Sequence, residues 1–173
     1  MKRSIILALC ILAHPIFAIN QAAARQQPAD KPPLAPAFSL KDLRGRSVRL
    51  DDQKGRVLLI NFWATWCAPC LAEMPDLVKL QKEYGPRGLQ IIGITYPPVD
   101  RAGVRRMVRR LKINYTILFG SDKTAKDYDV GEVLPATIVV DREGKIRARI
   151  LGILESEEFD EKVKPLLTTS AER

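Results

Sequence analysis

Two cysteines separated by two residues, Cys67 and Cys70, are the residues of this sequence best suited to carry out chemistry. They lie in the string NFWATWCAPC, which begins at Asn61. A Cys-x-x-Cys pair between a strand and a helix forms a redox dithiol, because the helix N-terminus stabilises a thiolate on the first cysteine. We therefore expect Cys67 to be the attacking thiolate. Cys70, one turn further on, is expected to resolve the resulting mixed disulfide.

The N-terminus has the pattern of an export signal. Lys2 and Arg3 precede an apolar stretch at 5–13, and Ala22–Ala24 offers small residues for cleavage. We expect residues 1–24 to be a signal peptide, with an uncleaved membrane anchor as the alternative. The apolar run is shorter than the about 20 residues that span a bilayer. Either way, the sequence predicts a domain in the periplasm or at the extracytoplasmic face of the membrane.

Histidine and further cysteines are missing from the chain beyond this leader. The third cysteine, Cys10, and the single histidine, His14, both lie within residues 1–24. Histidine-based catalytic triads, histidine-rich zinc sites and copper sites made of cysteine and histidine are therefore excluded. A structural disulfide framework is excluded too, because the two remaining cysteines would close too short a loop. We predict no metal and no cofactor other than the Cys67–Cys70 disulfide.

Composition and charge indicate one soluble domain. The 173 residues are 46% apolar and 28% charged, which suits a single globular domain once a leader is removed. The formal net charge of +8 is moderately basic. No nucleic-acid-binding motif accompanies it, so we expect no nucleic-acid partner, and we expect a monomer.

The chain before the cysteines divides into a tether and a hairpin. Residues 25–36 are polar and rich in proline, which predicts an extended tether ahead of a domain at 37–170. Apolar and polar residues alternate at 38–40 and 48–50 on either side of the turn at Arg44–Arg46. This alternation predicts an amphipathic β-hairpin with one buried face.

Buried strands should position the cysteines. Continuous apolar stretches at 57–62 and 89–95 predict two strands covered on both faces. A helix from Ala68 to about Tyr84 connects them, which makes a βαβ unit with a parallel strand pair. The further expected elements are a helix at Arg101–Lys112, strands at 116–119, 137–140 and 145–150, a helix at 123–128, and a last helix capped by Ser156 and ended by Pro165.

The helix expected at Arg101–Lys112 is amphipathic and basic. Apolar residues lie on one face and five arginines on the other. A surface helix packed by its apolar stripe is the favoured interpretation. A face that docks on a membrane or a partner is the alternative.

Together, the order of elements and the string NFWATWCAPCLAEMP resemble the exported thiol-disulfide oxidoreductases of the TlpA/ResA-like family, which includes the CcmG-type reductases of cytochrome c maturation. The resemblance covers about Phe38 to Leu167. It implies an α/β, thioredoxin-like fold with a central mixed sheet flanked by helices and an N-terminal β-hairpin extension. It also implies disulfide-bearing exported proteins as substrates, apocytochrome c among them, and a membrane thiol electron donor.

The resemblance assigns proton transfer to Glu73. In thioredoxins the position of Asn61 holds a buried aspartate that exchanges protons with the second cysteine, which asparagine cannot do. In ResA-like proteins a glutamate three residues after the second cysteine has a related role, and Glu73 occupies that position. Helical spacing brings it towards Cys70, and burial would raise its pKa towards the working pH. An exposed helical glutamate is the alternative.

The resemblance also indicates a substrate-binding region. It places Pro135 in a cis peptide bond against the dithiol, so that the backbone of Leu134 can bind an extended substrate segment. An ordinary trans proline at a strand start is the alternative. Trp66 is expected to be a lid beside the sulfurs. Ala68 and Pro69 place no ionisable group between the cysteines, unlike strongly oxidising relatives with histidine there, which favours a reductase.

Two other functions compete with the reductase. Cys67 and Cys70 could instead hold Cu(I) for delivery, because thiolates are soft ligands, although no histidine assists them. A peroxiredoxin-like peroxidase fits worst, because no serine or threonine lies three residues before either cysteine in a proline-led loop.

Overall fold

Strand β3, Val57–Trp63, lies inside the sheet, and all seven of its residues are buried. It pairs in parallel with β4, Leu89–Thr95, and antiparallel with β6, Ala136–Val140. Burial on both faces explains the continuous apolar run that predicted this strand. The computed structural model describes residues 32–168, so the predicted leader, residues 25–31 of the predicted tether and the last residues of the chain lie outside the described residues.

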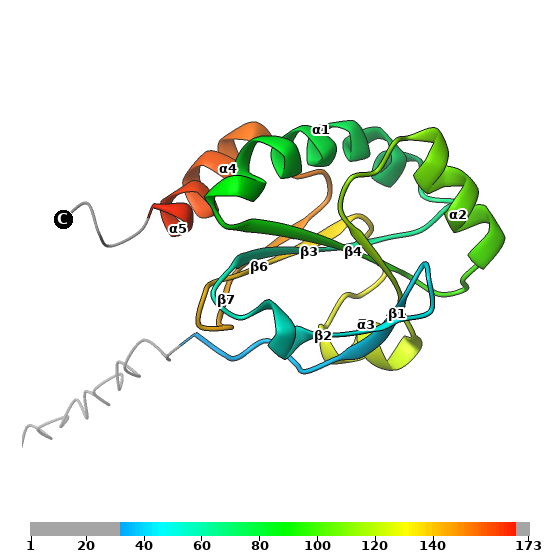
Figure 1. Ribbon diagram of the computed structural model, residues 1–173, viewed down its shortest axis with the longest axis horizontal. Coiled ribbons are helices and arrows are strands. Elements are labelled where there is room, and N and C mark those ends of the chain that lie inside the picture. Colours follow the sequence, from blue (N-terminus) through cyan, green and yellow to red (C-terminus); the bar gives the residue numbers. More distant parts are fainter. Residues whose placement is uncertain (1–31, 169–173) are drawn as a thin grey trace, which may run out of the picture. The chain divides into compact units, whose positions relative to one another are not determined.

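The described residues form a seven-stranded sheet in the order β2-β1-β5-β4-β3-β6-β7 (Figure 1). Parallel pairs join β3 to β4 and β4 to β5, and the other pairs are antiparallel. The predicted mixed sheet and its N-terminal hairpin are confirmed, and the hairpin joins the sheet by pairing β1 with β5. The remaining strands are β1, Ser39–Asp42; β2, Ser47–Arg49; β5, Thr116–Phe119; and β7, Ile146–Leu151.

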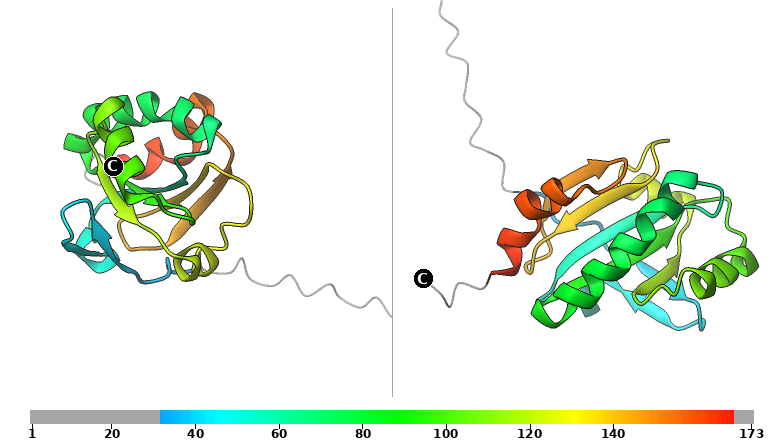
Figure 2. Two further views of the ribbon diagram at one scale, coloured as in Figure 1. Left: turned by 90° about the vertical axis from the view of Figure 1, so that its right-hand side faces the viewer. Right: turned by 90° about the horizontal axis from the view of Figure 1, so that it is seen from above.

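Helices cover both faces of the sheet (Figure 2). Helices α1, α2, α4 and α5 pack on one face, where Trp63, Met74 and Phe159 belong to one core cluster. Helix α3 packs on the other face, where Tyr128 contacts Phe62 with ring centroids 5.5 Å apart. None of the helices in residues 32–168 is long and apolar enough to cross a membrane. The helices are α1, Ala68–Tyr84; α2, Arg101–Arg110; α3, Asp122–Asp127; α4, Ser156–Lys162; α5, Lys164–Leu167; and the 3-10 turns η1, Leu50–Gln53, and η2, Gly85–Arg87.

The C-terminal helix differs from its prediction. It is split into α4 and α5, and Glu155 rather than Ser156 is the residue that precedes the first helical turn. Pro165 lies in the first turn of α5 and does not end a helix. The physical reason is that the first N–H groups of a helix have no partner within it, so proline is tolerated there.

Residues 33–36, which we expected to belong to the tether, contact the turn between β6 and β7. The Ala35 N–H donates to the Gly144 carbonyl at 2.9 Å, and the Ile146 N–H donates to the Pro33 carbonyl at 2.8 Å. Proline lacks an N–H but still offers a carbonyl acceptor, so a proline-rich segment can bond along a strand. The end of this segment is therefore attached to the domain.

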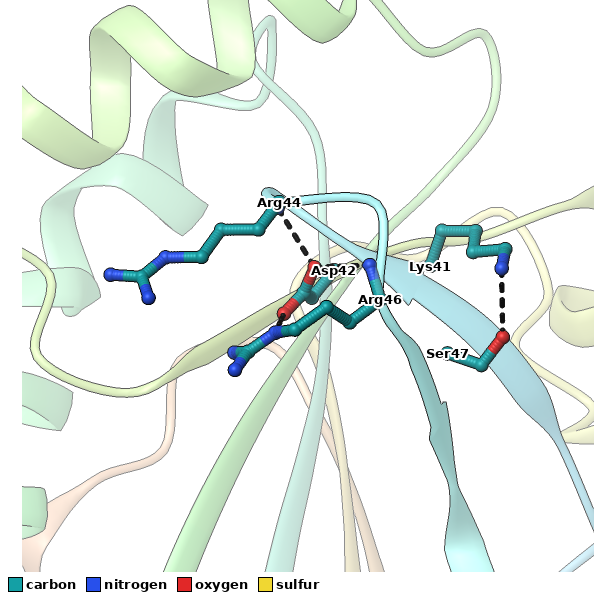
Figure 3. A network of polar contacts seen from close by, with 5 residues as sticks. All are labelled: Lys41, Asp42, Arg44, Arg46 and Ser47. Carbon is teal, nitrogen blue, oxygen red and sulfur yellow. Dashed lines mark hydrogen bonds and ion pairs between the residues drawn. The ribbon is translucent and has the colours of Figure 1, made fainter.

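Asp42 organises the turn of the N-terminal hairpin (Figure 3). Its Oδ1 accepts the backbone N–H groups of Arg44 at 2.8 Å and Arg46 at 2.9 Å, and its Oδ2 accepts from Arg46 Nε at 2.7 Å. Beside it, Lys41 Nζ donates to Ser47 Oγ at 2.8 Å across the two strands. A buried carboxylate with three donors fixes the turn that connects β1 to β2.

The substitution Asp42→Ala is expected to lower the free energy of unfolding by about 1 to 2 kcal/mol, because it leaves the turn amides without their acceptor. Urea unfolding followed by circular dichroism measures this change. Asp51→Ala is the matched control, since Asp51 is exposed and contacts only exposed cations, and its unfolding midpoint should stay near that of the wild type. Equal midpoints for the two variants would show that Asp42 does not hold the turn.

Candidate active site

The two cysteines lie where β3 gives way to α1. Cys67 is the N-cap residue of α1, Cys70 lies in its first turn, and the two form a disulfide with Cα atoms 5.3 Å apart. The Sγ of Cys67 accepts the backbone N–H of Cys70 at 3.2 Å. A thiolate on Cys67 would keep this donor and gain from the helix dipole, which favours the charged sulfur.

The cysteines differ in their access to solvent. Cys67 keeps 5% of its surface exposed and Cys70 none. Pro69 lies in the first turn of α1, where its fixed φ suits a helix start. An approaching partner can therefore reach the sulfur of Cys67 before that of Cys70, as the order of roles predicted from the sequence requires.

Glu73 is buried in the helix that begins at the dithiol. It lies three residues after Cys70 on the buried face of α1 and is only 3% exposed, so the alternative of an exposed helical glutamate is wrong. Burial raises the pKa of Glu73 to about 7, although hydrogen bonds from the Leu154 N–H and the Asn61 amide act in the opposite direction. A carboxyl group with this pKa can exchange protons near neutral pH.

Asn61 holds Glu73 in place. Its Nδ2 donates to Glu73 Oε1 at 2.7 Å and to Thr137 Oγ1 at 3.0 Å, and the Leu154 N–H donates to Glu73 Oε2 at 3.2 Å. Asn61 Oδ1 has no hydrogen-bond partner among the described residues. A rotated amide would therefore offer this oxygen to a protonated Glu73. Sequence reasoning placed Asn61 near the site but missed its contact with Glu73.

Pro135 lies at the same end of the sheet as the dithiol. It precedes Ala136, which pairs with Phe62 on β3, and the predicted cis peptide bond between Leu134 and Pro135 is confirmed. The Pro135 carbonyl accepts the Gly152 N–H at 2.8 Å. A second cis bond, before Pro98, was not predicted.

Several apolar side chains stand exposed near this end of the sheet, among them Leu151, which is 64% exposed and pairs with Ala136. Trp66 is next to Cys67 and 60% exposed, and Val133 precedes Leu134 and is 51% exposed. Trp63, in contrast, is fully buried in the core. Sequence reasoning missed Val133, although an apolar residue just before the Leu134–Pro135 pair was a usable signal. Exposed apolar side chains beside a reactive sulfur suit contact with a partner protein.

A disulfide at a helix N-terminus, a buried carboxylate behind it and a cis-proline segment at the same end of a mixed sheet define a thiol-disulfide oxidoreductase. Comparison with known proteins agrees with this class. The chain belongs to the AhpC/TSA family, whose model matches residues 33–149, and it is a ResA-like member.

The similar proteins carry corresponding descriptions. The chain is 36% identical over 131 residues to the thioredoxin-like protein YneN of Bacillus subtilis, covering 75% of this chain and 76% of that protein. It is 34% identical over 135 residues to the thiol-disulfide oxidoreductase ResA of Geobacillus thermodenitrificans, covering 76% of each.

Solved structures share the fold. A thiol:disulfide interchange protein of the thioredoxin family from Chlorobium tepidum is 28% identical, with a TM-score of 0.72 over 80% of this chain and 98% of that one. A thiol-disulfide oxidoreductase from Bacteroides fragilis is 29% identical, with a TM-score of 0.67 over 78% of this chain and 99% of that one. The thioredoxin-like fold expected from the sequence is thereby confirmed.

Proposed function

We propose that this chain is an exported reductase of protein disulfides. The observation that carries the proposal is the Cys67–Cys70 disulfide at the start of α1, with only Ala68 and Pro69 between the sulfurs. Neither intervening residue can be charged, so neither adds to the thiolate stabilisation that the helix N-terminus provides. A moderately stabilised thiolate gives a dithiol that is more reducing than pairs with a cation between the cysteines.

The reaction transfers two electrons from the dithiol to the partner. The Cys67 thiolate attacks one sulfur of the partner's disulfide, forms a mixed disulfide and displaces the other sulfur as a thiolate. The Cys70 thiolate then attacks Cys67 Sγ, which releases the second partner sulfur as a thiolate and forms the Cys67–Cys70 disulfide. The partner is reduced to a dithiol and the protein is oxidised, with no cofactor besides the two cysteines.

Glu73 acts in the second step of this reaction. Cys70 must lose its thiol proton before it attacks, and the carboxylate of Glu73 is the buried base nearest in sequence on the same face of α1. A pKa of about 7 keeps this group partly ionised at neutral pH. Leu134, Pro135 and Trp66 bind the partner's segment around the sulfurs.

The export pattern in the N-terminal sequence supports the proposed setting of the reaction. Residues 1–24 direct export, and residues 25–36 link to the domain at 37–170, which is soluble after cleavage or anchored at the extracytoplasmic face of the membrane. Exported proteins with disulfides, including apocytochrome c, are the substrates. A membrane thiol donor returns two electrons to the Cys67–Cys70 disulfide, and the protein works as a monomer.

The reduction potential of the dithiol tests the direction of the reaction. Equilibration of the protein with glutathione buffers, followed by thiol alkylation and mass measurement, should give a value nearer thioredoxin's about −270 mV than the about −120 mV of a strong oxidant. A reduction potential near that of the strong oxidant would overturn the reductase proposal.

Titration of the reduced protein with Cu(I) tests the alternative function in copper delivery. Tight copper binding by a protein that reduces no test disulfide would establish the delivery function instead.

A further inference from the structure

Helix α2 carries a concentrated positive charge that the dithiol chemistry does not use. Residues 32–168 contain 23 lysines and arginines against 18 aspartates and glutamates, a formal charge of +5. Residues 100–112 contain six basic residues and one acidic residue, which gives the same charge of +5. The other described residues contain 17 basic and 17 acidic residues, so their charges cancel. We call the exposed arginines of α2 the arginine face: Arg101, Arg105, Arg106, Arg109 and Arg110.

The arginine face is scarcely neutralised within the domain. Its one ion pair in residues 32–168 joins Arg106 to Asp100 at 3.5 Å, and both side chains are mostly exposed. Such pairs contribute little. The guanidinium of Arg101 stacks over the Phe119 ring at 4.1 Å, which fixes its position without removing its charge. Arg105 and Arg109 have no ion pair with any residue in the described part of the chain.

The arginine face begins at the end of the sheet that carries the dithiol. Strands β3 and β4 are parallel, with Trp63 paired to Thr95 at their carboxyl ends. The chain continues from β3 through Cys67 into α1 and from β4 through Asp100 into α2, so both helices start at that end (Figure 1). Helix α2 then extends about 15 Å, the length of four or five residues of an extended peptide.

We propose that the arginine face binds an acidic segment next to the disulfide of the partner protein, and so selects partners whose disulfides have acidic neighbours. The inference rests on the proposed function, because it concerns how a partner's disulfide reaches Cys67. Arginine suits this task, since its guanidinium pairs with carboxylates through two parallel hydrogen bonds.

A protein partner fits this surface better than a membrane does. Helices that bind membranes insert their apolar side between lipids. The apolar side of α2 is already used by the fold, because Val104 is buried and Met107 and Val108 pack against the core. Only charge remains available, and it starts at the end of the sheet where a partner's disulfide must arrive. Charge complementarity of this kind raises association rates by roughly 10- to 1,000-fold and weakens steeply with salt.

Two disulfide peptides with the same ring test the inference, one flanked by four glutamates and the other by four lysines. The reduced wild-type protein should reduce the acidic peptide about tenfold faster at low salt, and the difference should vanish in about 1 M salt. The triple variant Arg105→Gln, Arg109→Gln, Arg110→Gln should lose this preference. The matched control removes the same charge from the end of β2 and from the segment that leads into β3: Arg49→Gln, Lys54→Gln, Arg56→Gln.

The outcomes separate the inference from the proposed function. Equal reduction rates for the two peptides, or an equal loss of the preference in both triple variants, would overturn the proposed role of the arginine face. Neither result would contradict the proposed reductase function. Reduction of neither peptide would overturn the reductase. In that case fluorescence anisotropy of the labelled acidic peptide still measures its binding to the protein. An unchanged affinity in the triple variant of Arg105, Arg109 and Arg110 would overturn the inference as well. Loss of binding to phosphatidylglycerol vesicles in that variant, without any peptide preference, would assign the surface to a membrane instead.

Discussion

The variant Cys67→Ser is expected to lose disulfide reduction by about 10³-fold or more, because the serine hydroxyl stays protonated and cannot attack a disulfide. The reduced variant still carries the Cys70 thiol, but that sulfur is fully buried and cannot reach the partner first. Single-turnover reduction of a cyclic disulfide peptide, followed by the appearance of free peptide thiols, measures the loss.

The variant Cys70→Ser gives the complementary result. Its Cys67 still attacks, but no resolving thiol follows, so the mixed disulfide with the peptide should accumulate and appear as an added mass on a non-reducing gel or by mass spectrometry. Trapping by Cys67→Ser and none by Cys70→Ser would reverse the roles of the two sulfurs. Circular dichroism of both variants shows whether the fold survives each substitution.

The parts of the fold that were predicted are those with strong local patterns. The continuous apolar runs of β3 and β4 and the helix between them were placed to within a residue, because burial on both faces imposes such runs. The order of the strands was not predicted. The pairing of β1 with β5 joins residues more than 70 positions apart, and no local pattern encodes such a contact. The split between α4 and α5 was missed because proline signals both a helix end and a helix start.

In the site, too, the features with a local sequence pattern were predicted and those set by distant contacts were not. The cysteine spacing identified the dithiol, because its geometry is local to one helix start. The hydrogen bonds that hold Glu73 come from Asn61, 12 residues before it, and from the backbone of Leu154, 81 residues after it. A backbone donor has no side-chain signature, so this partner could not be found in the sequence. The contact of Asn61 with Glu73 could have been found, because Asn61 alternates with Leu59 and Trp63 on the face of β3 that packs against α1.

The pKa of Glu73 also makes stability depend on pH. An ordinary glutamate has a pKa of 4.5, and burial raises that of Glu73 to about 7 in the disulfide form of the protein. The folded state therefore binds the proton more tightly than the unfolded chain does. This stabilisation is fully present below pH 4.5 and is lost as the pH rises through about 7. Ionised Glu73 then costs the fold about 3 kcal/mol relative to its protonated form.

The variant Glu73→Gln is expected to slow the release of the partner by about 10²-fold at neutral pH, because the glutamine cannot take the proton of Cys70. Rapid mixing of the reduced protein with a disulfide peptide, quenched by acid, separates this second step from the attack by Cys67. In the wild type the rate of release should rise through about pH 7 as Glu73 ionises. In the variant the rise of the release rate near pH 7 should disappear, while the rate of attack by Cys67 stays the same.

Stability measurements check that slower release by the variant does not come from damage to the fold, whereas the pH profile of release reports the proton transfer itself. Glutamine resembles the protonated acid, with Oε1 able to accept from the Leu154 N–H and Nε2 able to donate to Asn61 Oδ1. Oxidised Glu73→Gln should therefore unfold like the wild type at pH 4 and be more stable at pH 9 by up to about 3 kcal/mol. Glu83→Gln, on the exposed side of the same helix, is the control and should change neither profile. If Glu73→Gln releases the partner at the wild-type rate at every pH, the proton of Cys70 leaves by another route.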